Sequence, residues 1–170
     1  MSSARFLRTL LLIGAATMLG ITQSAYAFDF GYTVGGDGAC NFSTIQAAVA
    51  AAVISGENRI NIATNRTYTA QAIAINNQNL TLIGGYQNCA NLIAPSANTT
   101  IDGTGNGTHS VIAITGTSNV VLENLTIAGG HLGSSQTGGA IYFGGSGPLT
   151  LTSSTVPNHS SNFGGGIHVN

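Results

Sequence analysis

The sequence contains no lysine, and only 5% of its 170 residues are charged. Beyond residue 27, two arginines oppose five carboxylates, which leaves a net charge of −3; the residues are Arg59, Arg66, Asp29, Asp37, Glu57, Asp102 and Glu123. Two cations cannot neutralise a run of phosphates, so we expect neither nucleic acid nor an anionic lipid surface as a partner. Disorder is also disfavoured, because it requires low hydrophobicity and high net charge, whereas 43% of this chain is apolar.

Long hydrophobic runs are lacking except near the N-terminus. Arg5 and Arg8 precede an apolar stretch over residues 10–19, and Ala25-Tyr26-Ala27 has the small–x–small pattern of a cleavage site. A membrane anchor would need about 20 apolar residues, more than this stretch offers. We therefore predict a signal peptide over residues 1–27, with Ala25 and Ala27 at the cut. The protein is expected to be secreted or placed on a bacterial cell surface or outer membrane, without a transmembrane helix after signal removal.

Cysteine is scarce, with two residues, Cys40 and Cys89. An even number of cysteines in an exported chain favours one disulfide bond. The alternative is two free thiols, buried or metal-bound, although no cysteine or histidine stands at a zinc-like spacing to either.

One helix is predicted, over residues 43–55. Ser43 is a suitable N-cap, Gln46 completes a capping box three residues later, and Gly56 ends the helix. Apolar residues recur at helical spacing, namely Ile45, Ala48, Val49, Ala52 and Val53. A helix this apolar must pack on a larger apolar surface, so we interpret residues 28–58 as an N-terminal cap, beginning with a turn-like, glycine-rich segment over residues 28–41.

From Arg59 onward the apolar period changes from helical to alternating, in short runs separated by Asn, Gly, Thr and Ser. The offset from Ile112 to Ile141 superposes five apolar positions of 112–127 on five of 141–156, and a slightly shorter offset relates Ile141 to Ile167. Such a repeat predicts coils whose strands pair in parallel. The expected interior residues are Ile112, Ile114, Val120, Leu122, Ile127, Ile141, Phe143, Leu149, Leu151, Val156, Ile167 and Val169.

The predicted fold is therefore all-β, a right-handed parallel β-helix over residues 59–170 with one N-terminal capping α-helix and an incomplete C-terminal end. Tyr142 and His168 would lie one above the other on the outside, as a candidate contact surface. The last coil stops at its first strand, so we expect a truncated fragment whose open C-terminal end leads to marginal stability, to self-association, or to both.

Several segments resemble the pectin-lyase-like superfamily of right-handed parallel β-helices: CNFSTIQAAVAAA, LTLIGGYQNC, TTIDG and NVVLENLTI. Within it, the run Gly138–Ile141 is similar to the GGA(I/L/V) repeat of polymorphic outer-membrane autotransporter passengers. The resemblance implies a disulfide between Cys40 and Cys89. It also implies that an enzyme on this scaffold would act on acidic polysaccharide, through an Arg or Lys base with Ca²⁺ or through several Asp residues on one sheet.

The carboxylates do not repeat at the coil spacing, and Glu123 aligns with Thr152 of the next coil. The loop after Asp102 offers a single carboxylate, so we interpret it as a turn and not as a calcium site. Solvent-facing side chains are expected for the four histidines, His109, His131, His159 and His168. We thus predict no catalytic residue, no cofactor and no metal.

The expected function is a non-catalytic adhesin or surface stalk, with host or cell-surface carbohydrate or protein as its partner. The alternative is the N-terminal part of a polysaccharide lyase or glycoside hydrolase whose active site lies beyond residue 170.

Overall fold

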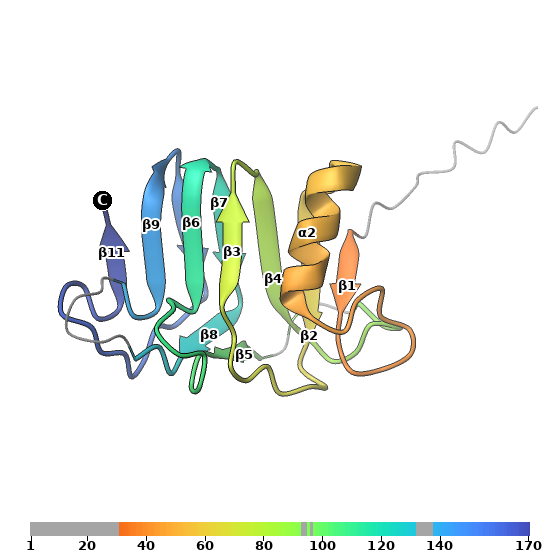
Figure 1. The fold of residues 1–170 in the computed structure, drawn as a ribbon. Helices are drawn as coiled ribbons and strands as arrows, with labels where there is room; N and C mark the ends of the chain where they lie inside the picture. The colour runs from red at the N-terminus through yellow and green to blue at the C-terminus, as the bar shows by residue number, and fades with distance from the viewer. Residues whose placement is uncertain (1–30, 93–94, 96, 132–137) are drawn as a thin grey trace, which may run out of the picture.

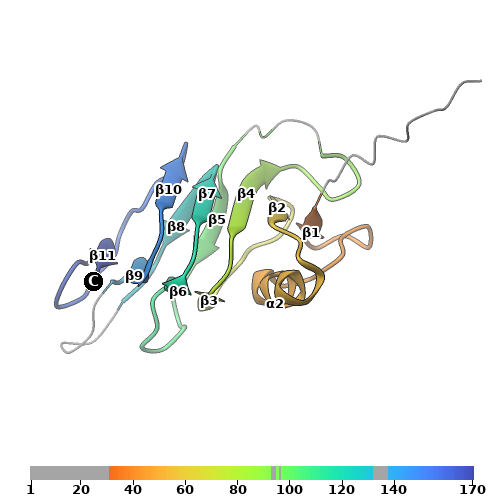
Figure 2. The same cartoon turned by 90° about the horizontal axis from the view of Figure 1, so that it is seen from above.

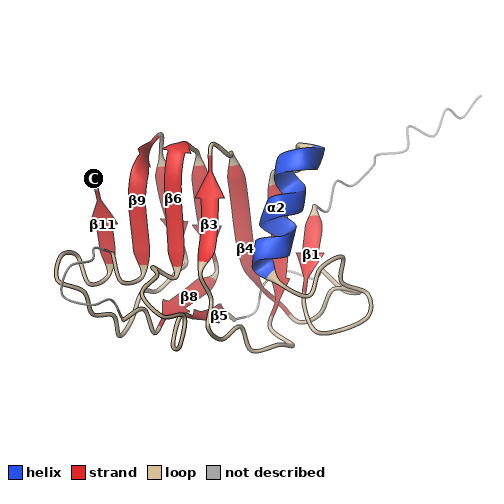
Figure 3. Cartoon of the chain, in the orientation of Figure 1, coloured by secondary structure: helices blue, strands red, loops and turns tan. Residues whose placement is uncertain are grey.

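The computed structural model describes residues 31–92, 95, 97–131 and 138–170. The predicted signal peptide and Asp29 lie outside these residues. The described part consists mainly of parallel strands with one short helix (Figure 1, Figure 3), in agreement with the predicted all-β class. Within it, no helix combines the length and the apolar character needed to span a bilayer.

Helix α2 covers Ile45–Ser55, close to the predicted range. Its N-cap is Thr44 and not Ser43: the Thr44 hydroxyl accepts a hydrogen bond from the Ala47 amide at 3.3 Å. The predicted capping box is also wrong, because the Gln46 side chain bonds to Ala74 of strand β3 and not to the helix start. Gly56 ends the helix in the left-handed conformation, at φ 75°, as expected.

Four helix residues are buried, Ile45, Ala48, Val49 and Ala52. Val53, which was expected on the same stripe, is 62% exposed. The helix covers the end of the strand layers and contacts β1, β2 and β3, so only its inner face meets apolar side chains.

The largest sheet has five parallel strands in the order β1-β2-β4-β7-β10. The strands are β1 (Tyr32–Val34), β2 (Arg59–Ala63), β4 (Leu80–Tyr86), β7 (Val120–Glu123) and β10 (Leu149–Thr152). Strand β1 lies in the segment expected to be turn-like, and it pairs with β2. The glycines on both sides of Tyr32–Val34 favoured a turn, although Tyr32 and Val34 alternate as the apolar residues of the other strands do.

A second sheet has four parallel strands in the order β11-β9-β6-β3, and a third consists of β5 and β8. The strands are β3 (Ile73–Asn76), β6 (Ile112–Thr117), β9 (Ile141–Ser146), β11 (Ile167–Val169), β5 (Thr99–Asp102) and β8 (Leu125–Ala128). Figure 2 shows the sheets forming separate walls, with α2 in line with the second sheet next to β3. None of the sheets in the described residues closes on itself.

The sequence repeat corresponds to a pairing register. Strand β6 pairs with β9 so that Ile112 lies beside Ile141, and β7 pairs with β10 so that Val120 lies beside Leu149. The shorter step places Ile167 beside Ile141. Successive layers of the chain therefore stack with matching positions in contact, at the spacing of neighbouring strands, about 4.8 Å.

Burial of the expected interior residues changes along the chain. Those from the first repeat and the start of the second are buried: Ile112, Ile114, Val120, Leu122, Ile127, Ile141 and Phe143. Leu149, Leu151 and Val156 are half-buried and pack against the core. Ile167 and Val169, also expected in the interior, are 40% and 67% exposed, because β11 has a neighbour, β9, on one side only.

The corner between β7 and β8 shows how the chain turns between sheets. Asn124 has φ 52° there, and Ser153, at the equivalent corner of the next layer, has φ 49°. The Asn98 side-chain amide bridges the two layers by donating to the carbonyls of Leu125 and Ser153. Asparagine tolerates the left-handed region better than most residues, which explains its abundance between the apolar runs.

Candidate functional site

The outer face of the β3-β6-β9-β11 sheet carries a pair of stacked rings. Tyr142 on β9 is the register partner of His168 on β11. Their ring centroids are 5.9 Å apart and their planes differ by 7°. Both side chains are half-buried. The structure thus places next to each other the two residues that the sequence repeat selected.

Gly144 makes room for the Tyr142 ring. A Cβ atom at Gly144 would overlap the Tyr142 hydroxyl oxygen and would lie 2.5 Å from a ring carbon, so any side chain at this position would displace the ring. The tyrosine therefore extends along its own strand, over the position where the next outward side chain would stand. The glycine at this position is explained by space and not by backbone conformation.

The strand register places Ala113 of β6 beside Tyr142, and Ala74 of β3 beside Ala113. Together with His168, these residues form one row across the sheet. Further along the strands, Thr115 stands beside Gly144, and beyond them the Thr117 and Ser146 hydroxyls are 3.3 Å apart. Among the described residues of these four strands, none of the outward positions is Asp, Glu, Lys or Arg; they are Ala74, Asn76, Ala113, Thr115, Thr117, Tyr142, Gly144, Ser146 and His168. We call these nine positions the outer face.

The disulfide predicted between Cys40 and Cys89 is present. It joins the loop before α2 to the loop after β4. The Asp37 carboxylate lies beside it and accepts hydrogen bonds from the Cys89 amide, the Ala39 amide and the Asn65 side chain. The Cys89 amide contributes most to holding the pKa of Asp37 below its usual value. Because both sulfurs are in the disulfide, this cluster is a clamp between loops and not a metal centre.

The other described carboxylates lie in separate parts of the fold. Glu57 accepts from the amides of Asn58 and Arg59 after the helix, and Asp102 accepts from the Thr104 amide after β5. Glu123 ends β7 beside Thr152, the residue with which the sequence repeat aligned it.

The two arginines also have local partners. Arg59 donates to the side chains of Asn61 and Tyr86, and Arg66 donates to the backbone carbonyl of Ser43. Both guanidinium groups therefore join strands and loops of the capped end.

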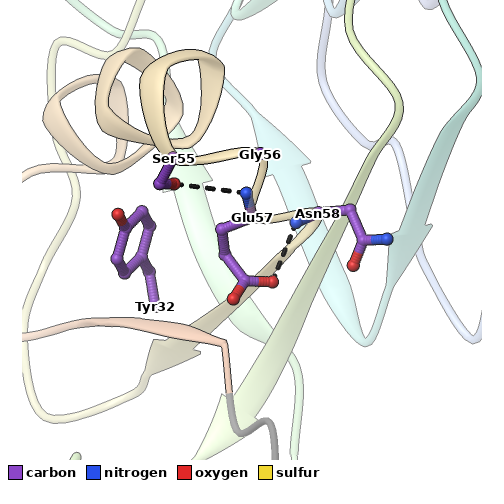
Figure 4. A pocket seen from close by; sticks show the side chains of 5 residues that line it. All are labelled: Tyr32, Ser55, Gly56, Glu57 and Asn58. Atoms are coloured by element: carbon purple, nitrogen blue, oxygen red, sulfur yellow. Dashed lines mark hydrogen bonds between the residues drawn. The ribbon is translucent and has the colours of Figure 1, made fainter.

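A depression of about 300 Å³ lies between the end of α2 and strand β1 (Figure 4). It is lined by Tyr32, Ser55, Gly56, Glu57 and Asn58. Within it, the Ser55 hydroxyl accepts from the Glu57 amide. Sequence reasoning missed this site because the segment after residue 55 shows only the end of a helix.

Among the histidines, His109 and His131 are exposed, as expected. His159 departs from the prediction because it ties two layers together: Nε2 lies 2.7 Å from the Ile127 carbonyl oxygen, and Nδ1 accepts from the Gly130 amide. Gly130 and His159 are separated by the same offset as Ile112 and Ile141, so the repeat makes them neighbours in successive layers, while the rotamer of the His159 ring decides that they bond.

Comparison with known proteins gives no assignment. Neither a family model, nor a curated protein, nor a solved structure matches the chain.

Proposed function

We propose that this chain is an exported, non-catalytic adhesive protein built as a right-handed parallel β-helix of the pectin-lyase-like type, secreted or held at a bacterial cell surface. The parallel pairing of equivalent positions in successive layers supports the β-helix interpretation. So does the helix at the N-terminal end, because a solenoid needs a cap where its first layer would otherwise be open.

The outer face is the observation that carries the adhesive role. It presents a stacked Tyr142–His168 pair and uncharged hydroxyl and amide side chains on four parallel strands. Side chains on strands that are paired on a rigid sheet are held in fixed positions, which suits recognition of an extended ligand. Aromatic rings combine a large contact area with little conformational freedom, so they are effective contact residues.

The arrangement of the acidic side chains supports a non-catalytic role. Glycoside hydrolysis requires a pair of carboxyl groups roughly 5 to 10 Å apart. The described carboxylates are instead distributed over separate parts of the fold: Asp37 beside the disulfide, Asp102 at the end of β5, and Glu123 at the end of β7 in another sheet. Asp37, Glu57 and Asp102 each accept hydrogen bonds from backbone amides.

The full chain, expressed in a bacterial host with its own N-terminal segment, tests this proposal. We expect it in the exported fraction, and we expect the purified protein to adhere to cells or saccharide-coated surfaces more than a heat-unfolded sample does. Retention inside the cell, or adhesion equal to that of the unfolded sample, would contradict the proposal. Release of reducing ends or of unsaturated products from polysaccharides would replace it with an enzymatic function.

A further inference from the structure

The charged residues of the described chain avoid one face of the molecule. Asp102, Glu123 and Arg59 lie on the other two sheets, and the remaining charges lie in loops of the capped end. The outer face has none of them at its nine outward positions. Because complementary charge is the usual means of selecting ionic partners, a face without it favours a neutral ligand.

The Tyr142–His168 pair offers an aromatic contact of low polarity. The rings are nearly parallel, and Ala113 and Ala74 complete the row with methyl groups. A pyranose ring has a face of C–H groups that packs on an aromatic ring, while its hydroxyl groups point outward around the edge. This combination requires an aromatic surface with hydrogen-bonding side chains at its border.

Hydrogen-bonding side chains stand at that border. Thr115 lies on the strand next to Tyr142, beside Gly144, and the Thr117–Ser146 hydroxyl pair lies beyond it at the end of the same two strands. At about 3.3 Å per residue, the span from Tyr142 to Ser146 is roughly 13 Å along the strand, longer than a single sugar ring. The outer face is thus long enough for an oligosaccharide.

A protein partner fits the face less well. Stable protein interfaces bury about 800 Å² on each partner and concentrate their binding energy in aromatic side chains that enter pockets. Here the two rings stack on each other and are half-buried, and the Tyr142 ring lies over Gly144. We propose that Tyr142 and His168 form a platform that binds a neutral oligosaccharide of pyranose units, with the Thr117–Ser146 side of the face contacting its hydroxyl groups. This inference rests on the proposed adhesive function and specifies its ligand.

The experiment titrates the full chain with cellotriose, mannotriose and triacetylchitotriose, using trigalacturonate as the anionic control, and follows the backbone amides by NMR. We expect saturable shifts at Tyr142 and His168 with at least one neutral sugar and none with trigalacturonate. The Tyr142→Ala variant should lose at least tenfold in affinity, whereas Tyr142→Phe, which keeps the ring, should bind nearly as well as the original chain.

Two further variants serve as matched controls. Phe163→Ala removes a ring that is 59% exposed outside the outer face, and Thr150→Ala removes an outward hydroxyl from β10 in another sheet; neither should change affinity. If Tyr142→Ala fails to fold, judged by circular dichroism, His168→Ala takes its place with the same expected loss.

The outcomes separate the two proposals. Adhesion that is unchanged by both Tyr142→Ala and His168→Ala would overturn the platform and leave the adhesive function standing. The absence of shifts with all three neutral sugars, or shifts caused by a captured protein and by no sugar, would also overturn the platform. Sugar binding at Tyr142 without any adhesion would support the platform and overturn the adhesive function.

Discussion

The two ends of the stacked layers contain similar apolar strands but bury them very differently. At the end covered by α2, Ile60 and Ile62 of β2 have no measurable exposure. At the other end, Ile167 and Val169 are 40% and 67% exposed, although they occupy the same kind of alternating position. The comparison shows that alternation selects which side of a strand faces inward, while burial depends on what packs over that side.

The capped end is held by several different interactions. Gln46 of the helix bonds to both backbone groups of Ala74, which satisfies the outer edge of β3. The disulfide fixes the loop before the helix, and the buried Tyr68 hydroxyl lies 3.1 Å from the Val34 carbonyl oxygen and 3.0 Å from that of Ala63. At the opposite end, the short strand β11 pairs with β9 alone.

Removal of the disulfide should have the largest effect. Replacement of both cysteines, Cys40→Ser and Cys89→Ser, frees a loop closed by a sequence separation of 49 in the unfolded chain. The chain-entropy model then predicts a loss of about 4 kcal/mol in the free energy of unfolding, measured by urea denaturation. Addition of a reductant to the original chain should produce the same loss and should leave the double variant unchanged. A loss below about 1 kcal/mol would show that the capped end does not depend on this bond.

The second prediction compares isoleucines in one row of the β6-β9-β11 sheet. Ile112→Ala should lower the free energy of unfolding by about 3 kcal/mol, because it leaves a cavity among fully buried side chains. Ile167→Ala removes the same atoms from a partly exposed position and should cost less than about 1 kcal/mol. If both variants lost the same free energy of unfolding, measured by thermal or urea denaturation, Ile167 would be buried in solution. The difference in burial between the two ends of the stacked layers would then be contradicted.

The smallest effect concerns the Tyr68 hydroxyl. Burial raises the pKa of Tyr68 to about 12, from an ordinary value near 10. The folded state therefore favours the neutral phenol, and this contribution to stability is fully present below pH 10 and disappears as the pH rises towards 12. The Tyr68→Phe variant should lose about 1 kcal/mol at neutral pH, since it removes a buried hydrogen bond. It should also show a shallower decline of unfolding free energy across that alkaline range. A decline as steep as that of the original chain would assign the alkaline effect to other groups.

Much of the fold was predictable because it depends on local periodicity. The helix range, the parallel pairing and the register of β6 with β9 followed from the helical period, the strand alternation and the offset of the repeat. Strand β5 was missed because Thr99–Asp102 contains one apolar residue, Ile101, and so shows no alternation. Strand β1 was missed because Tyr32–Val34 stands between glycines. Ser43 was chosen as the N-cap over Thr44 because serine is the more common N-cap and Gln46 follows it at the capping-box spacing, whereas the path of the backbone decides between the two hydroxyl groups.

The candidate site was predictable only in part. The repeat placed Tyr142 beside His168, since residues at equivalent positions of paired strands are neighbours. It did not reveal that Tyr142 folds over Gly144 or that His159 bonds to backbone groups of the preceding layer, because both depend on side-chain rotamers. The depression beside Glu57 combines the end of a helix with strand β1, which no local pattern relates.

Residue spacing alone was enough to establish which segments could form strands, which of their side chains share a side, and which positions of successive layers correspond, because these properties follow from backbone geometry. How deeply each apolar side chain is buried, which hydroxyl caps the helix and which polar groups meet across layers became known from the packed molecule. Burial and long-range hydrogen bonds depend on neighbours that are distant in sequence, and those neighbours are fixed only when the whole chain has packed.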